Sequence, residues 1–258
     1  MTYETILYES AEGVATITLN RPQQLNAVNR QLAQEWGMAL AEADRDERVH
    51  AVLITGAGRG FCVGQDLSTL KEGMTGGQIL REMYNPILLA LRRLPKPVVA
   101  AVNGAAVGAG MNLALACDLR LAAENASFGQ VFARIGALPD SGAFFFLPRM
   151  VGLARAAELF FNAEIIDARR AHEFGLVNAV HPAEELMPKA LEYARRLAAG
   201  PTQVYARIKA GLNEAFGFTL QQALEFEANG QEATMATADF QEGVAAFLEK
   251  RPATFTGT

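Results

Sequence analysis

Hydrophobic and polar positions follow two different periods along this chain, strand-like at the start and helical in the last third. Residues 4–20 place β-branched and apolar residues on both sides of a turn at residues 11–13, which predicts a β-hairpin. Residues 31–44 carry apolar side chains at helical spacing, and residues 51–55 form a short apolar run that ends in glycines. The chain is therefore predicted to begin with a hairpin, a helix and a buried strand.

The alternation of helices and strands continues through the middle of the chain. A helix is predicted over residues 77–94, a buried strand over 97–102, a short helix over 108–116 and a strand over 119–122. Strands that alternate with helices favour a parallel sheet joined by right-handed crossovers. The sequence thus predicts the α/β class.

The last third of the chain carries few strand signals. An amphipathic helix is predicted over residues 186–197, Pro201 is placed to begin another helix, and residues 218–248 are rich in helix formers. We expect an α/β core in residues 1–195, followed by a helical appendage in residues 196–258.

Composition narrows the class of protein. The 258 residues are 50% hydrophobic and 20% charged, which is enough for a full core in one large domain or in a domain with an appendage. A net charge of -5 offers no basic field for nucleic acid. Cys62 and Cys117 are too few for a disulfide framework or a zinc site, so we expect buried thiols and no metal. The first residues resemble neither a signal peptide nor a membrane anchor, which makes the cytoplasm the expected location.

Two glycine-rich turns carry most of the chemical information. The turn at residues 56–67 (GAGRGFCVGQDL) follows the strand at 51–55, and the turn at 103–112 (NGAAVGAGMN) opens the short helix. Glycines let backbone amides face a ligand, and amides at a helix N-terminus favour an anion. Each turn can therefore supply one amide to a developing oxyanion. Phe61 occupies the last glycine position of a GxGxxG pattern, which disfavours a dinucleotide-binding turn.

Asp140 is a lone carboxylate in an apolar segment. Between residues 128 and 152 only Arg134 and Arg149 are also charged, so no adjacent cation accounts for it. Burial would raise its pKa towards the range useful for proton transfer, whereas a surface acid in a loop is the alternative. The neighbours that are expected to bury it are Ala137, Leu138, Pro139 and Phe144.

Five segments, taken in order, form a highly specific set: TLNRPQQLNAV at 18–28, TGAGRGFCVGQDL at 55–67, PKPVVAAVNGAAVGAGMNLALACDLRLA at 95–122, FGQ at 128–130 and EGVAAFLEKRPATF at 242–255. Together they resemble the crotonase superfamily, the enoyl-CoA hydratase/isomerase family, over essentially the whole chain. The resemblance implies a crotonase-like β-β-α spiral core with a C-terminal helical appendage. The core, residues 1–195, would bind acyl-CoA thioesters, and the appendage, residues 196–258, would serve oligomerisation. It also implies a homotrimer or a dimer of trimers, and no cofactor, because coenzyme A is part of the substrate.

The resemblance also implies roles for individual residues. The thioester carbonyl would lie between the backbone amides of Gln65 and Ala109, which form an oxyanion hole. Lys250, from the same or a neighbouring subunit, resembles a phosphate contact, with a solvated surface lysine as the alternative. For Asp66 the turn context favours a carboxylate that caps its own loop over a catalytic role. The substrate-binding residues implied are Leu25, Ala27, Val28, Gln65, Asp66, Leu67, Ser68, Gly108, Phe132 and Lys250.

The sequence departs from the family pattern at two positions. Hydratases of the family carry glutamates where this chain has Asn112 and Phe132, neither of which transfers a proton. Asp140 stands where hydratases often have glycine, as in the branch that includes ring 1,2-epoxyphenylacetyl-CoA isomerase and Δ3,Δ2-enoyl-CoA isomerases. One carboxylate suffices for isomerisation, because it can remove a proton from one carbon and return it at another. We therefore expect an acyl-CoA isomerase with Asp140 as acid and base; an enoyl-CoA hydratase with a displaced acid and a catalytically silent acyl-CoA-binding homologue are the alternatives.

Overall fold

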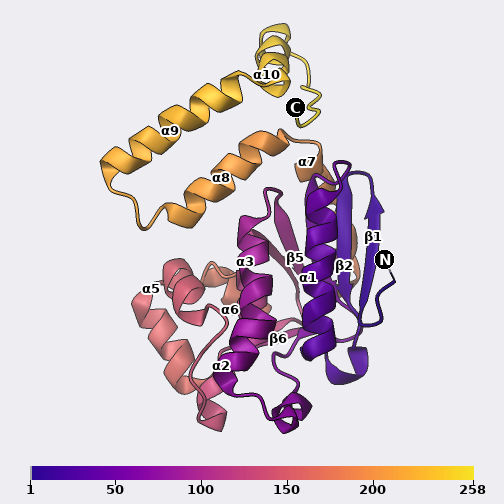
Figure 1. Ribbon diagram of the computed structural model, residues 1–258, viewed down its shortest axis with the longest axis vertical. Helices are drawn as coiled ribbons and strands as arrows, with labels where there is room; N and C mark the ends of the chain where they lie inside the picture. Colours follow the sequence, from indigo (N-terminus) through magenta and orange to yellow (C-terminus); the bar gives the residue numbers. More distant parts are fainter. Residues whose placement is uncertain (1) are drawn as a thin grey trace.

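The N-terminal hairpin forms as predicted. The computed structural model describes residues 2–258, without the side chains of residues 70–72 (Figure 1). Strands β1 (Ile6–Ala11) and β2 (Val14–Leu19) pair in antiparallel register, with Ile6 opposite Leu19 and Ala11 opposite Val14. Gly13 has a φ of +78°, a conformation that glycine adopts without steric cost and that closes the tight turn.

A six-stranded sheet forms the centre of the molecule, in the order β1-β2-β3-β5-β7-β10. From β2 onward all neighbours are parallel, which confirms the crossover architecture. Helices α1 and α3 cover one face, in front of the sheet in Figure 1, and α7 covers the other. The added strands are β3 (Ala51–Gly56), β5 (Val98–Val102), β7 (Leu119–Ala123) and β10 (Ala179–His181).

A second, four-stranded sheet lies next to the first and positions the site. Its order is β4-β6-β8-β9, with β9 antiparallel to β8. Each of the strands β3, β5 and β7 is followed by a short strand of this second sheet and then by helical structure, which is the β-β-α spiral expected from the sequence. The strands are β4 (Gly60–Cys62), β6 (Ala105–Val107), β8 (Ser127–Gly129) and β9 (Ile165–Asp167).

The core helices predicted over residues 31–44, 77–94, 108–116 and 186–197 form, with one irregularity, whereas the two helices between residues 143 and 173 were not predicted. The helix predicted over residues 77–94 is interrupted by a wide π-helical turn, Leu80–Tyr84. The α-helices of the core are α1 (Arg30–Arg45), α2 (Gly76–Ile79), α3 (Asn85–Arg93), α4 (Ala109–Leu115), α5 (Ala143–Asn162), α6 (Ala168–Glu173) and α7 (Ala183–Ala198). Short 3-10 turns are η1 (Pro22–Gln24), η2 (Leu67–Glu72) and η4 (Val131–Ile135).

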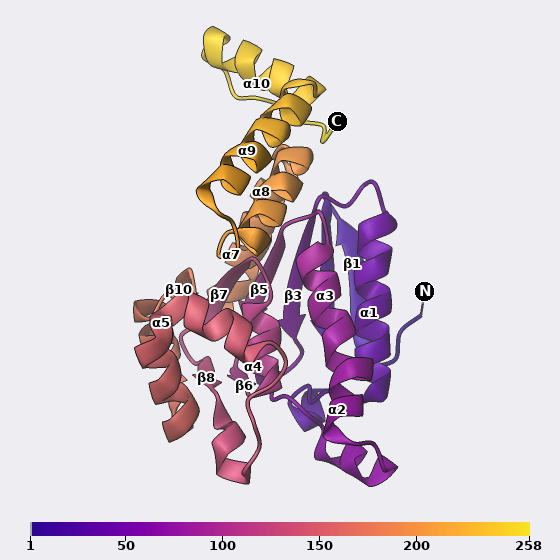
Figure 2. The ribbon, with the colours of Figure 1, turned by 60° about the vertical axis from the view of Figure 1, so that its left-hand side comes forward.

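The C-terminal region is helical, as predicted, and projects from the core. Helices α8 (Thr202–Glu214), α9 (Leu220–Met235) and α10 (Ala238–Glu249) lie together at one end of the molecule (Figures 1 and 2). The expected boundary after residue 195 falls within the last turn of α7, which packs on the central sheet. Strands β9 and β10, each only three residues long, were not predicted, because the strand signal in this part of the sequence is weak.

A buried ionic cluster attaches α8 to the core. Asp118, directly before β7, accepts a hydrogen bond from Arg92 at 3.0 Å and pairs with Lys209 of α8 at 2.8 Å. Lys209 is only 5% exposed, and its ammonium also donates to the carbonyl of Lys96. Burial lowers the pKa of Lys209, and the Asp118 carboxylate opposes that effect.

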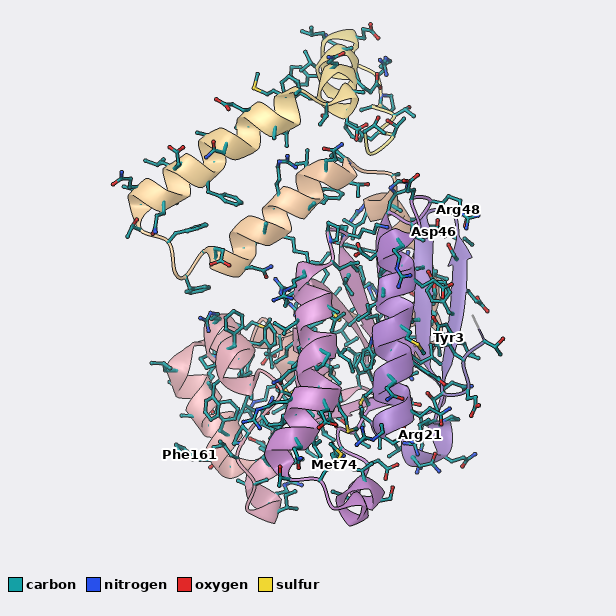
Figure 3. The ribbon with its side chains drawn as sticks, in the orientation of Figure 1. Tyr3, Arg21, Asp46, Arg48, Met74 and Phe161 are labelled. Atoms are coloured by element: carbon teal, nitrogen blue, oxygen red, sulfur yellow. The ribbon has the colours of Figure 1, made fainter. Side chains whose placement is uncertain are left out.

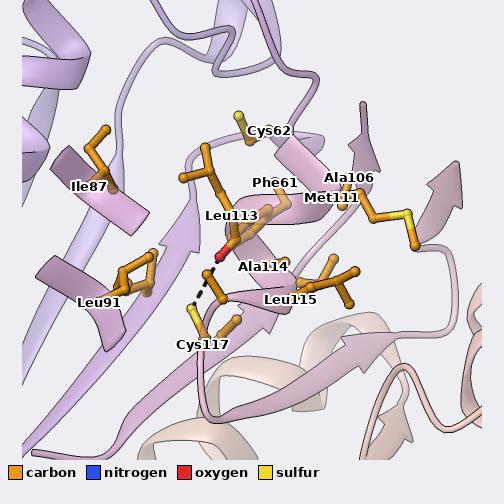
Figure 4. Packing of buried hydrophobic residues seen from close by; sticks show 14 of the residues in the cluster. Phe61, Cys62, Ile87, Leu91, Ala106, Met111, Leu113, Ala114, Leu115 and Cys117 are labelled. Atoms are coloured by element: carbon orange, nitrogen blue, oxygen red, sulfur yellow. Dashed lines mark hydrogen bonds between the residues drawn. The ribbon is translucent and has the colours of Figure 1, made fainter. Parts of the chain in front are cut away.

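The hydrophobic core fills the space between the sheets and the helices. Cys62 and Cys117 are both buried within it, as Figure 4 shows, and burial raises the pKa of each thiol to about 12. The prediction of buried, unpaired thiols is thereby confirmed. Over residues 2–258, no helix combines the length and the apolar character needed to cross a bilayer.

Candidate active site

The two glycine-rich turns meet where the parallel strands β4 and β6 end. A Cβ atom at Gly64 would lie 3.2 Å from the amide nitrogen of Ala109, and one at Gly110 would lie 2.0 Å from the carbonyl oxygen of Cys62. Backbone therefore packs directly on backbone here, which only glycine allows. Gly64 also has a φ of +85°. The approach of the two turns places Gln65 next to the start of α4.

The amides of Gln65 and Ala109 are free to bind an oxyanion. Ala109 is the first residue of α4, so its N–H has no partner within the helix. The adjacent amides are occupied, since Asp66 N–H donates to the Val28 carbonyl at 3.0 Å and Gly108 N–H to that of Gly129 at 2.8 Å. Neither the Gln65 nor the Ala109 amide donates a hydrogen bond to any described residue. Two fixed, unused donors on adjoining turns are what an oxyanion hole requires.

Asp140 is half-buried on the turn that precedes α5. Burial raises the pKa of its carboxyl group, and the hydrogen bond that the Ser141 hydroxyl donates to Oδ1 at 2.8 Å lowers it; the net pKa is raised. The enclosure does not come from the neighbours in sequence. Leu138 is 73% exposed, Phe144 is 56% exposed and Ala137 is exposed, so that part of the prediction is wrong. Pro139, the fourth of these neighbours, is partly buried.

Helix α4 instead holds the turn of Asp140 in place. The Asn112 side chain donates to the backbone carbonyl of Asp140 at 2.8 Å, and it accepts a hydrogen bond from Gln130 at 2.7 Å. Asn112 and Gln130 are both fully buried. The helix whose first amide is one of the two unused donors thus also fixes the backbone of the candidate acid. A lone polar residue in the apolar run GAGMNLALA was the sequence signal for this role of Asn112.

The segment after Gln65 begins a 3-10 turn that Asp66 caps. Its carboxylate accepts from the Ser68 amide at 3.0 Å and hydroxyl at 2.7 Å, and pairs with Arg21 at 2.8 Å. Burial alone would raise the pKa of Asp66, but these hydrogen bonds and the Arg21 charge outweigh it and lower the pKa. The capping interpretation of Asp66 is confirmed. The role of Arg21, labelled in Figure 3 beside this loop, was missed by the sequence reasoning.

Residues 25–28 join the same region through Val28, which forms a parallel β-bridge with Gln65. Asn26 anchors the loop, because its side chain donates to the carbonyls of Ala57 and Gly60 at 3.0 and 2.8 Å. The segments predicted to line the coenzyme A path are therefore adjacent. Ala27 and Val28 are buried, Leu25 is partly buried, and Leu67 and Ser68 are exposed.

Phe132 and Lys250 fall in very different places. Phe132 is buried and lies 3.7 Å from the position of a Cβ atom at Gly108, so its ring borders the second glycine turn. Lys250 is exposed in a left-handed conformation at the end of α10, which lies far from α4 in Figure 2. Within a single chain, Lys250 does not join the other predicted residues.

Among the side chains that the structure describes, no group of three His, Cys, Asp or Glu is placed to hold a metal ion.

Comparisons with known proteins agree with this architecture. The family model described as enoyl-CoA hydratase/isomerase matches residues 9–258. A protein of Rhodobacter capsulatus named "Probable enoyl-CoA hydratase" is 45% identical over 100% of both chains. The 1,2-epoxyphenylacetyl-CoA isomerase of Escherichia coli is 42% identical over 98% of this chain and 99% of its own.

A solved structure extends the likeness to three dimensions. The crystal structure of an enoyl-CoA hydratase from Bacillus anthracis superimposes with a TM-score of 0.93, covers 99% of this chain and 100% of its own, and is 34% identical. The family model spans nearly the whole chain, and the relatives match it from end to end. The chain belongs to the enoyl-CoA hydratase/isomerase family.

Proposed function

We propose that this enzyme is an acyl-CoA isomerase in which Asp140 moves the proton and the amides of Gln65 and Ala109 stabilise the enolate oxygen. One observation carries the proposal: Asp140 is a half-buried carboxylate with a raised pKa, held by the helix that begins at Ala109. Asn112 and Phe132 stand where a hydrating pair of acids is expected, and Asn112 is committed to hydrogen bonds with Gln130 and the Asp140 backbone.

The reaction needs one acid and one pair of donors. The Asp140 carboxylate accepts a proton from a substrate carbon, the electron pair moves towards the thioester oxygen, and the two amides stabilise the resulting negative charge. Removal of one such donor typically costs about 3 kcal/mol of transition-state stabilisation. The carboxylic acid then returns the same proton at another carbon, so a double bond shifts or a ring rearranges without a cofactor. Burial favours the neutral acid, which helps to keep the proton in the site between the two steps.

The name of one relative supports a ring substrate. Because the 1,2-epoxyphenylacetyl-CoA isomerase of E. coli is 42% identical over nearly the full length, the same substrate is our first choice, and a linear 3-enoyl-CoA is our second. We propose that residues 25–28 and 65–68 contact coenzyme A, and that Gly108 and Phe132 border the acyl group. We also propose a homotrimer or a dimer of trimers, in which Lys250 reaches the phosphates bound to a neighbouring subunit.

The decisive test is the variant Asp140→Asn, which keeps the shape of the side chain and removes the base. We expect isomerase activity on 1,2-epoxyphenylacetyl-CoA and on a 3-enoyl-CoA to fall by about 10³-fold, within the range for loss of a general acid-base group. Affinity for a saturated acyl-CoA, measured by calorimetry, should change little. Full isomerase activity in Asp140→Asn would contradict the proposal.

A hydratase remains the second candidate, because a relative that is 45% identical carries that name. Assays of a 2-enoyl-CoA and a 3-enoyl-CoA side by side separate the two reactions: hydration consumes water and yields a 3-hydroxyacyl-CoA, whereas isomerisation conserves the mass of the substrate. Binding of acyl-CoA without turnover across the panel would instead indicate a catalytically silent homologue.

A further inference from the structure

A cavity lies between the core and the C-terminal helices, apart from the candidate active site. Its volume is about 210 Å³, and its lining comes from α5, from the segment around β7 and from the C-terminal end of α8, which lies beside α5 in Figure 1. None of Gln65, Ala109 and Asp140 lines it. The buried lining residues include Leu115, Arg120 and Phe146, and the exposed ones include Phe145, Arg149 and Phe216.

Positive charge dominates the lining of this cavity. Three guanidinium groups, those of Arg92, Arg120 and Arg149, face one carboxylate, that of Asp118. The Asp118 carboxylate is already engaged, because it pairs with Arg92 at 3.0 Å and with Lys209 at 2.8 Å. Arg120 and Arg149 therefore have no carboxylate partner among the described residues.

Arg120 is the buried member of this unpaired couple. Its side chain is 6% exposed, and its Nε and Nη1 donate to the carbonyls of Leu176 and Cys117 at 2.6 and 2.7 Å. Its Nη2 donates to no described residue, yet it is not one of the enclosed side-chain atoms that lack a partner, so it keeps accessible surface. Burial lowers the pKa of Arg120 and the charge of Arg92 acts in the same direction, but a guanidinium stays protonated. A buried charge of this kind is unfavourable until an anion meets it.

Arg149 holds a second guanidinium at the rim. Its Nη1 donates to the Phe145 carbonyl at 2.8 Å, and the group lies 3.8 Å from the centre of the Phe145 ring and 5.4 Å from that of Phe216. The stacking fixes the guanidinium and leaves its other nitrogens without a partner among the described residues. Phe146 stands edge-on to Phe145, with ring centres 5.2 Å apart, so the wall beside the cations is aromatic.

We propose that this cavity binds a small aryl carboxylate, whose carboxylate group accepts hydrogen bonds from Arg120 and Arg149 and whose ring packs against Phe145, Phe146 and Phe216. Guanidinium groups match the planar carboxylate, and aromatic rings pack favourably edge to face. An inorganic anion would satisfy the cations but leave the aromatic wall unused. The site is independent of the proposed isomerase reaction, since it shares no residue with it.

The test uses benzoate, its neutral analogue benzamide, and acetate, which lacks the ring. We expect ligand-observed NMR titrations to show that benzoate binds about tenfold more tightly than benzamide, as charge-assisted hydrogen bonds allow, and at least tenfold more tightly than acetate, because the ring is buried. Saturating butyryl-CoA should not displace benzoate. Equal binding of benzoate and benzamide, or displacement by butyryl-CoA, which would place benzoate in the acyl pocket, would overturn the inference.

Two exposed arginines of α5 supply the variant and its matched control. Arg149→Gln removes the charge at the rim, so the preference for benzoate over benzamide should fall at least threefold. Arg155 stacks on Phe174 with its guanidinium 4.7 Å from the ring centre and does not line the cavity. Arg155→Gln should therefore keep the full preference. An undiminished preference in Arg149→Gln, or an equal loss in both variants, would show that benzoate binds elsewhere.

Discussion

At the residue scale, two opposing influences set the state of Asp140. Burial favours the neutral acid and the Ser141 hydroxyl favours the carboxylate. Since the folded-state pKa lies above the unfolded value of about 3.9, the stability that this group contributes is fully present below that value. It is lost as the pH rises through the folded-state pKa. The half-buried acid therefore costs stability in the pH range in which the proposed mechanism needs it as a base.

Ser141→Ala tests this balance. The change removes the hydrogen bond that lowers the pKa, so the pKa of Asp140 should rise further. Because the first step needs the carboxylate, the acidic limb of the profile of kcat/KM against pH should move to higher pH, while activity on the alkaline side largely recovers. Ser10→Ala, at an exposed position of β1, is the control and should leave the limb in place. An identical profile in Ser141→Ala would show that the hydroxyl does not tune the acid.

The residues of the site differ in how far the sequence could predict them. Asp140 was recognisable because a lone carboxylate stands out in an apolar segment, and the amides of Gln65 and Ala109 follow glycine-rich turns. The hydrogen bond from Asn112 to Asp140 spans 28 positions and depends on how α4 faces the turn before α5, which no local pattern encodes. For the same reason, sequence neighbours gave the wrong account of what encloses Asp140.

At the element scale, helix α4 contacts both the first glycine-rich turn and the turn of Asp140. Its N-terminus carries one of the two amides proposed for the oxyanion hole, its second residue packs on the Cys62 carbonyl, and Asn112 holds the turn of Asp140. Helix α1 was predicted closely, because many residues report its period, whereas the longer α5, which contains Pro148 and a non-helical Gly152, was not predicted. The strands β9 and β10 were not predicted, since three residues define no period. The π-helical turn was also not predicted, because the sequence on both sides of it keeps a helical pattern.

Gly110→Ala should damage α4 directly. The new methyl group would lie 2.0 Å from the Cys62 carbonyl oxygen, so β4 and α4 must separate. We expect a loss of about 3 kcal/mol in the free energy of unfolding, as for severe overpacking, and at least a tenfold loss of kcat because the Ala109 amide moves. Gly37→Ala, within α1 and with no atom within 4 Å, should instead stabilise by about 0.5–1 kcal/mol. Chemical denaturation of both variants measures the difference, and equal effects would refute the close-packing argument.

At the scale of the whole molecule, the apolar surface points to association. Leu153 and Phe161 of α5 are 80% and 83% exposed, and Phe247 of α10 is 83% exposed. Side chains of this size are rarely so exposed in numbers on a protein that stays monomeric. The C-terminal helices also form a largely apolar groove, lined in part by Val204, Phe240 and Phe247. This surface supports the proposed trimer, whose geometry no sequence pattern in one chain could provide.

Phe247→Glu tests that assembly. A charge in the contact should convert a trimer or hexamer at micromolar concentration into smaller species, as measured by sedimentation velocity. If Lys250 binds phosphates across the interface, the KM for acyl-CoA should rise together with dissociation. Gln241→Glu, an exposed polar position on the same helix, should leave the mass unchanged. A natural protein that sediments as a monomer would contradict the trimer outright.

The hydrogen-bonded path from Gln130 through Asn112 to the Asp140 backbone constrains the evolution of this enzyme. A change of Asn112 to glutamate would add an acid, but an ionised glutamate cannot donate to the Asp140 carbonyl, so the proposed proton carrier would lose its support. The Asn112→Glu variant would thus have a new acid at position 112 without a second glutamate beside it, and an Asp140 that is no longer held in position. Under the proposed mechanism, a second acid at position 112 would therefore require a compensating substitution that restores a hydrogen bond to the Asp140 carbonyl.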